Sequence, residues 1–223
     1  MLLTAGAMVA CVTTEPSGPI AREHHSYERG AATKVDVEIY MSAGELEMKS
    51  GAKTLFEGDF IFNVPALKPG MSYVVGAGEG TLTVHQGSAN GNYENSWRLS
   101  LDETTPIDLE VRLAAGDAQL ALGRVNLHGL KVRLGAGDLT LDLRGTPANS
   151  YSVNVEAGAG DTTIRLPASV GISARTTGLI GDSNVSGLEK RDGRWINPRA
   201  EASPVTIDVN VKHAIGDLRL VAE

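Results

Sequence analysis

At six places along this chain, a glycine and an acidic residue stand directly ahead of an apolar–polar–apolar alternation. The acidic residues are Glu45, Asp117, Asp138, Asp161, Asp182 and Asp217. If the segments stack in register, four of these carboxylates line one corner about 4.8 Å apart, and such a row could offer oxygen ligands to calcium. The spacing differs from that of an EF-hand loop, and an Asp after a turn glycine can accept hydrogen bonds from nearby backbone N–H groups. We therefore expect structural corner caps and no metal site.

Other residues with catalytic or ligating chemistry do not assemble into a motif. His24 and His25 are adjacent and therefore point in different directions in any regular element, so a solvated pair is favoured over a metal pair. The segment Gly76–Gly80 resembles a phosphate loop but leads into a strand, without the helix N-terminus that a phosphate site needs. Acid pairs such as Asp102–Glu103 could serve a polysaccharide-active enzyme, but they are as readily solvated strand residues. We expect no enzyme activity and no cofactor.

The single cysteine has a distinctive setting. Cys11 follows Met8-Val9-Ala10, which resembles a bacterial lipobox with Met in place of the usual Leu, and residues 1–10 are apolar and small. These features predict residues 1–10 as the remnant of a signal peptide, although no positively charged region precedes them. They predict Cys11 as a lipidation site and residues 11–33 as a flexible tether. The alternative is an incidental cysteine near a frayed terminus.

Composition narrows the class of protein. The chain has 223 residues, a formal net charge of −7, and only 4 % aromatic residues, so a core must be built mainly from aliphatic side chains. Nucleic acid is excluded as a partner because no basic stripe is visible. The stretch needed to span a bilayer, roughly 18 apolar residues, is also absent from the sequence.

Alternation of apolar and polar residues runs through most of the chain from Lys34 onward, and it predicts β-strands with one buried face. The corner glycines Gly116, Gly137, Gly160 and Gly181 are 21, 23 and 21 residues apart, which is the size of one solenoid coil. We predict an all-β domain over residues 34–223: a right-handed, three-sided parallel β-helix. The phenylalanines and Trp97 would form an N-terminal cap or the first coils, and residues 188–199 would form a hairpin protruding between coils. Trp97 and Trp195, expected on loops, could stack on sugars or cover the side of the solenoid.

The order of these motifs resembles a known family. Gly44-Glu45-Leu46-Glu47-Met48, then Phe56–Phe60 and Gly76–Gly80, look like the N-terminal part of a toast-rack domain, and the later Gly-Asp coils look like its C-terminal part. Toast-rack domains are similar to the extracytoplasmic part of LiaF-type bacterial proteins, which are linked to cell-envelope stress and wall-active antibiotics. The family offers no catalytic residues to transfer.

Two functions follow as expectations. The first is a non-enzymatic, lipid-anchored module of the bacterial envelope that acts in interactions or in envelope stress. The alternative is an adhesin-type surface protein that binds a glycan or peptidoglycan. Either would be extracytoplasmic, with the membrane and an envelope protein or glycan as partners. The sequence leaves the oligomeric state open.

Overall fold

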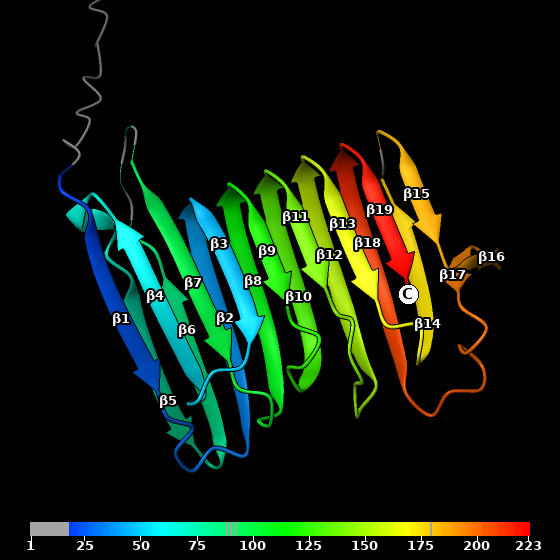
Figure 1. The fold of residues 1–223 in the computed structure, drawn as a ribbon, viewed down its shortest axis with the longest axis horizontal. Helices are drawn as coiled ribbons and strands as arrows, with labels where there is room; N and C mark the ends of the chain where they lie inside the picture. The colour runs from blue at the N-terminus through cyan, green and yellow to red at the C-terminus, as the bar shows by residue number, and fades with distance from the viewer. Residues whose placement is uncertain (1–17, 88, 90, 92, 179) are drawn as a thin grey trace, which may run out of the picture.

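The computed structural model describes residues 18–87, 89, 91, 93–178 and 180–223 of the chain. These residues form two large β-sheets that face each other, with one short 3-10 helix, η1 (Pro65–Leu67), in the described part (Figure 1). The expected all-β class is confirmed. The sheet with nine strands is called sheet A, and the sheet with ten strands is called sheet B.

The strands follow one another across each sheet in a fixed spatial order. Sheet A runs β1 (Ala21–Tyr27), β4 (Phe56–Phe62), β7 (Asn95–Leu101), β3 (Glu45–Ser50), β9 (Ala118–Ala121), β11 (Leu139–Asp142), β13 (Thr162–Leu166), β19 (Leu218–Ala222) and β15 (Ser183–Ser186). Sheet B runs β16 (Glu189–Arg191), β17 (Arg194–Ile196), β14 (Gly171–Thr177), β18 (Thr206–Ile215), β12 (Tyr151–Ala159), β10 (Leu127–Ala136), β8 (Ile107–Ala115), β2 (Lys34–Ala43), β6 (Glu79–His85) and β5 (Gly70–Gly76).

Each regular coil has the same path. A long strand of sheet B, such as β8, reaches a Gly-Asp corner, and a short strand of sheet A, such as β9, returns on the other side before a loop leads to the next coil. Neighbouring coils pair in parallel through β8, β10 and β12 and through β9, β11 and β13. The expected three-sided cross-section is wrong, because the return segments such as residues 122–126 contain no strand, so each coil has two sides.

The core lies between the two sheets and consists of in-register ladders of aliphatic side chains. In sheet B, Leu109 pairs with Leu130, which in turn pairs with Val153, and the ladder continues to Val209. In sheet A the corresponding ladder comprises Leu120, Leu141, Ile164 and Leu220. All eight side chains are buried. The period-two alternation seen in the sequence is therefore the pattern of a sheet with one face in the core.

The coils do not stack in chain order at the C-terminal end. The last coil, β18 and β19, lies between the coil of β12 and β13 and the coil of β14 and β15 (Figure 1). The uniform interval between corner glycines indicates only the length of a coil. It does not reveal that the coil after β13 leaves one position in the stack free. The final segment of the chain then fills that position.

Antiparallel strands complete the N-terminal end of the stack. In sheet A, β4 pairs with β7 and β1 pairs with β4, and in sheet B, β5 pairs with β6. Residues 21–27 were expected in a flexible tether, but they form β1. Tyr27 packs against Phe56 with ring centroids 6.4 Å apart, and His25 meets the edge of Phe60 at 5.8 Å. The other inward side chains of β1 are Ala21 and Glu23. The sequence of this edge strand therefore lacks the alternating large aliphatic residues that would indicate a strand.

Two further expectations need correction. Trp97 lies within β7, fully buried, with its ring edge-on to Phe60 at 5.2 Å, and not on a loop.

The hairpin of β16 and β17 turns at Asp192-Gly193, both with positive φ (49° and 77°), but it does not protrude between coils. Instead, β17 pairs antiparallel with β14 and extends the edge of sheet B. Trp195 lies in β17, half-buried, with Lys190 Nζ 5.5 Å from the centre of its ring.

Candidate binding groove on sheet B

The predicted acidic corner residues form a ladder that links successive coils. The carboxylate oxygen Oδ1 of Asp117 accepts a hydrogen bond from the backbone N–H of Asp138 (3.0 Å), and Asp138 accepts one in the same way from Asp161 (2.8 Å). The row continues from Asp161 to the N–H of Asp217 (3.0 Å) and from Asp217 to that of Asp182 (3.1 Å). Each carboxylate therefore bonds to the next coil in space, and not to its own turn.

The glycine before each acid belongs to the same corner. Gly137 has φ 123°, a conformation that L side chains rarely adopt, and a Cβ there would overlap the carbonyl oxygen of Gly116. The same overlap recurs between the corner glycines of neighbouring coils up to Gly181. Glycine is therefore required both by the backbone conformation and by the close approach of the coils.

The first acid of the row differs from the others. Among the side-chain hydrogen bonds of the described residues, none involves the carboxylate of Glu45, which is exposed. The corner beside it is held by Asn95, whose Nδ2 donates to the carbonyl oxygen of Ala43 (2.8 Å) while its Oδ1 accepts from Trp97 Nε1 (3.1 Å). The sequence does not reveal the role of Asn95, because no Gly-Asp pair marks its coil.

The remaining predictions concern the N-terminal segment with Cys11, a metal site, a membrane-spanning helix and the His24–His25 pair. Cys11 and residues 1–10 lie outside the described residues. In the described part of the chain, no three His, Cys, Asp or Glu side chains gather as a metal site would require, and no helix there is long and apolar enough to cross a bilayer. His24 Nδ1 lies 2.7 Å from Asp59 Oδ1, and His25 Nε2 lies 3.0 Å from Glu23 Oε2, so the two rings point to different partners.

An open groove of about 730 Å³ lies on the outer face of sheet B. It crosses the five strands β2, β8, β10, β12 and β18 just before their corners. Small residues form its floor: Ser42, Ala114, Gly135, Gly158 and Ala214. Longer side chains two positions earlier in each strand stand along one side: Tyr40, Arg112, Arg133, Glu156 and Lys212. The register of the sheet places these five side by side.

Charge is unevenly distributed in the groove. Its lining contains three cations, Arg112, Arg133 and Lys212, and one carboxylate, Glu156, although the chain as a whole is acidic. Arg133 Nε is 3.0 Å from Glu156 Oε2. Lys212 is exposed and has no carboxylate within 4.0 Å among the described residues. The groove is thus a basic strip on an acidic protein.

Arg112 is held by neighbours on both sides. Its Nε lies 2.5 Å from Glu110 Oε1, and its guanidinium carbon lies 5.0 Å from the centre of the Tyr40 ring. Burial raises the pKa of Glu110, but hydrogen bonds and charge from Arg112 and Lys131 outweigh this effect, so its pKa lies below the ordinary value. Glu110 therefore stays ionised and fixes the position of Arg112. Arg112 therefore covers one face of the Tyr40 ring.

Two buried polar side chains at the groove have one unused atom each. Gln86 Oε1 accepts hydrogen bonds from the backbone N–H groups of Ser42 (2.9 Å) and Ala43 (3.2 Å), while Nε2 has no partner among the described residues. His213 Nε2 bonds to the carbonyl oxygen of Gly160 (2.9 Å), and its Nδ1 is likewise without a partner. Both unused atoms are buried beneath the groove surface.

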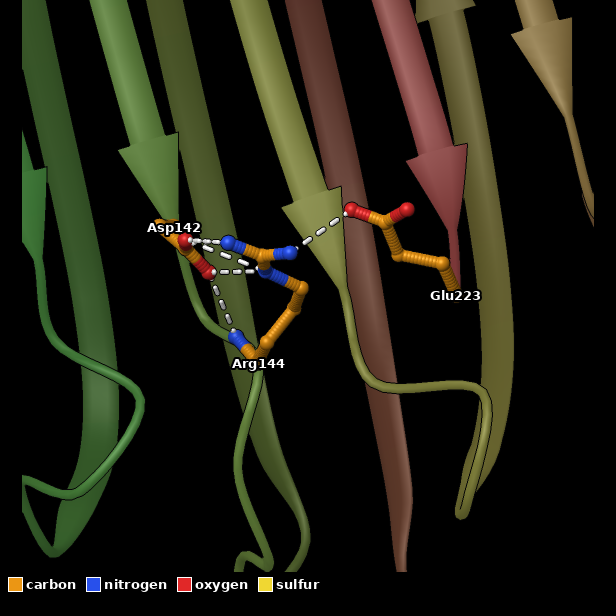
Figure 2. A network of polar contacts seen from close by, with 3 residues as sticks. All are labelled: Asp142, Arg144 and Glu223. Carbon is orange, nitrogen blue, oxygen red and sulfur yellow. Dashed lines mark hydrogen bonds and ion pairs between the residues drawn. The ribbon is translucent and has the colours of Figure 1, made fainter.

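A separate ion-pair network lies at the loop end of sheet A. Arg144 Nε and Nη2 both contact the carboxylate of Asp142, and Arg144 Nη1 reaches Glu223 Oε1 at 2.9 Å (Figure 2). The hydrogen bonds from the Arg144 side chain hold the pKa of Asp142 below its usual value. This network links the loop after β11 to the final residue of the chain, two strands away in the sheet.

Comparison with known families identifies the domain. Residues 16–165 match the family described as the N-terminal domain of toast_rack, DUF2154. The chain belongs to this family. The predicted toast-rack resemblance is thereby confirmed, and the match covers the regular coils from β2 to β13 as well as β1. No curated protein sequence matches the chain.

One solved structure superimposes closely on this toast-rack domain. It is described as a putative cell adhesion protein from Clostridium sporogenes, is 27 % identical, and covers 92 % of this chain and 100 % of its own with a TM-score of 0.83. Structures described as putative adhesins from Bacteroides fragilis (12 % identity, 92 % of this chain and 99 % of that one, TM-score 0.31) and Parabacteroides merdae (10 %, 91 % and 97 %, 0.27) superimpose too poorly to bear on this domain.

Proposed function

We propose that this toast-rack domain is a non-enzymatic adhesion module of the bacterial cell surface, held to the membrane by a lipid on Cys11. The observation that carries the proposal is the open groove on sheet B, which crosses five coils and combines a floor of small residues with a basic side. Such a surface is long and shallow, as contact with an extended ligand requires. The likeness to a putative cell adhesion protein at 27 % identity supports the same function.

The charged residues in the groove favour binding over catalysis. Hydrolysis of a glycosidic bond usually needs two carboxyl groups on either side of the bond. The groove lining contains a single carboxylate, Glu156, and Arg133 is paired with it. Four acids of the corner row already accept hydrogen bonds from the backbone of neighbouring coils: Asp117, Asp138, Asp161 and Asp217. These features support a ligand that is held and released unchanged.

The proposed anchor agrees with the position of the N-terminal strand. β1 is the outermost strand of sheet A, at the opposite end of the stack from the β16–β17 hairpin (Figure 1). A lipid on Cys11 would therefore attach one end of the solenoid to the membrane. We further infer a right-handed coil, because crossovers between parallel strands of one sheet almost always have that hand, and we infer that β1, β4 and β5 cap the open end. The envelope-stress role stays a prediction.

The test is adherence of the producing bacterium. Cells that make the wild-type protein should adhere to their substratum more strongly than cells that lack it, and Cys11→Ser should shift the protein from the membrane fraction to the soluble fraction with loss of adherence. Lipidated Cys11 should be visible by intact mass. Equal adherence with and without the protein would contradict the adhesion function, whereas an unmodified Cys11 in membrane-bound protein would contradict the anchor alone.

A further inference from the structure

The charged side of the groove is rich in hydrogen-bond donors. Lys212 is exposed, and its Nζ has no carboxylate oxygen within 4.0 Å among the described residues. Arg112 and Arg133 each have five N–H donors, of which their ion pairs with Glu110 and Glu156 use only part. A ligand that complements this surface must be rich in acceptor oxygens and negatively charged.

The backbone beneath the groove is already paired. The strands β2, β8, β10, β12 and β18 each have a neighbour on both sides, so their N–H and C=O groups serve the ladders of sheet B. A peptide bound by strand addition needs a free sheet edge, which this face does not offer. The floor of Ala, Gly and Ser residues also has no pocket for a particular side chain, so a peptide would find no anchor there.

The solenoid repeat places the charged side in a regular line. Neighbouring strands are about 4.8 Å apart, so the five strands extend over roughly 20 Å. Arg112 and Arg133 are on adjacent strands, and Lys212 is two strands beyond Arg133. A polymer with regularly spaced carboxylates can meet these cations while the apolar C–H faces of its sugar rings lie on the smooth floor.

We propose that the groove binds a linear acidic polysaccharide whose carboxylates contact Arg112, Arg133 and Lys212. This inference rests on the proposed adhesion function and names the ligand class for the same surface. No covalent step is involved. Because the contacts are largely ionic and exposed, binding weakens as salt is raised.

The experiment measures binding of three probes to the full chain by calorimetry. The first probe is a linear oligogalacturonate long enough to span the groove, the second is a neutral maltooligosaccharide of equal length, and the third is an oligoglutamate peptide of equal charge. The oligogalacturonate should bind, and binding should weaken with added salt. The neutral sugar and the peptide should not bind measurably. Equal binding of the peptide, or no binding of the oligogalacturonate, would overturn the proposal.

Matched charge reversals locate the site. Lys212→Glu should weaken oligogalacturonate binding roughly tenfold or more, because it replaces a cation of the groove with a carboxylate. A tenfold loss corresponds to about 1.4 kcal/mol. Arg219→Glu changes net charge identically and lies on an exposed position of β19 in sheet A of the same coil, so it should leave binding unchanged. Equal loss in both variants would contradict the groove as the site. Cell adherence without oligogalacturonate binding would refute this inference while leaving the adhesion function in place.

Discussion

The backbone N–H of Asp217 donates to Asp161 Oδ1 at 3.0 Å, although 56 residues separate the two along the chain. This bond marks the position where the last coil enters the stack. The coil of β14 and β15, which comes next in sequence after β13, is displaced one position outward. The final 18 residues, 206–223, thus hold the outer coil and its hairpin to the rest of the domain.

Asp161→Ala should destabilise the domain by about 0.5–2 kcal/mol, because it removes the acceptor that joins two coils and leaves the N–H of Asp217 without it. Asp161→Asn retains a capping oxygen and should cost less. Urea unfolding measures both. Asp182 ends the row, and no hydrogen bond of the described residues uses its side chain, so Asp182→Ala is the matched control. A cost at Asp182 equal to that at Asp161 would contradict the ladder.

Gly137→Ala should be much more damaging than Gly30→Ala, although both glycines have positive φ. At Gly30 a Cβ meets nothing within 4 Å, so only backbone strain of about 1–2 kcal/mol is expected. At Gly137 the added Cβ would overlap the carbonyl oxygen of Gly116, and neighbouring coils would have to separate. The melting temperatures of the two variants measure this difference. Similar melting temperatures would mean that the corner has room for a side chain.

Leu141→Ala should cost about 2–5 kcal/mol, because the side chain is fully buried in the core ladder of sheet A and its removal leaves a cavity. Thr140→Ala, on the exposed face of the same strand, should change stability by no more than about 0.5 kcal/mol. Chemical denaturation distinguishes the two, and a small effect at Leu141 would argue against a close-packed ladder.

The stability of the domain should fall as acid protonates Asp142. Hydrogen bonds from Arg144, partly opposed by burial, place the folded-state pKa of Asp142 below its ordinary value of 3.8. Because the folded-state pKa is lowered, the Asp142–Arg144 pair contributes its full stabilisation at pH values above the unfolded-state pKa of Asp142. This stabilisation is lost as the pH falls through the folded-state pKa. Stability measured between about pH 5 and pH 2 should therefore decline less steeply in Arg144→Gln than in the wild type. An unchanged slope would show that the pair contributes nothing.

Much of the regular part of this fold can be predicted from sequence because its repeat is explicit. The Gly-Asp pairs and the alternation around Leu141 or Val153 specify the corners, the buried face and the coil length. The order of the coils could not be predicted, because the interval from Gly160 to Gly181 is the same whether their coils touch or are separated. β1 was missed because His25 and Tyr27 occupy inward positions where an aliphatic residue would signal a strand.

The groove had a sequence signal that single motifs do not reveal. Arg112, Arg133 and Lys212 each lie four residues before a corner glycine, and Ala114, Gly135 and Ala214 each lie two residues before it. Aligning the coils on their corner glycines brings these residues into two columns, one of long side chains that also contains Tyr40 and Glu156, and one of small residues. The bond from Asn95 to Ala43 could not be found this way, since the coil of Asn95 lacks the Gly-Asp motif and only the fold brings Ala43 near it.

The most direct test of the adhesion function measures attachment of beads coated with the purified chain to the substratum on which the producing bacterium adheres. Beads that carry the wild-type chain should attach, and beads that carry Arg219→Glu should attach equally well, because that residue is exposed on sheet A. Beads that carry Lys212→Glu should lose most of their attachment, because the basic side of the sheet B groove is reversed at its unpaired cation. Undiminished attachment of the Lys212→Glu beads would contradict the claim that this groove is the adhesive surface.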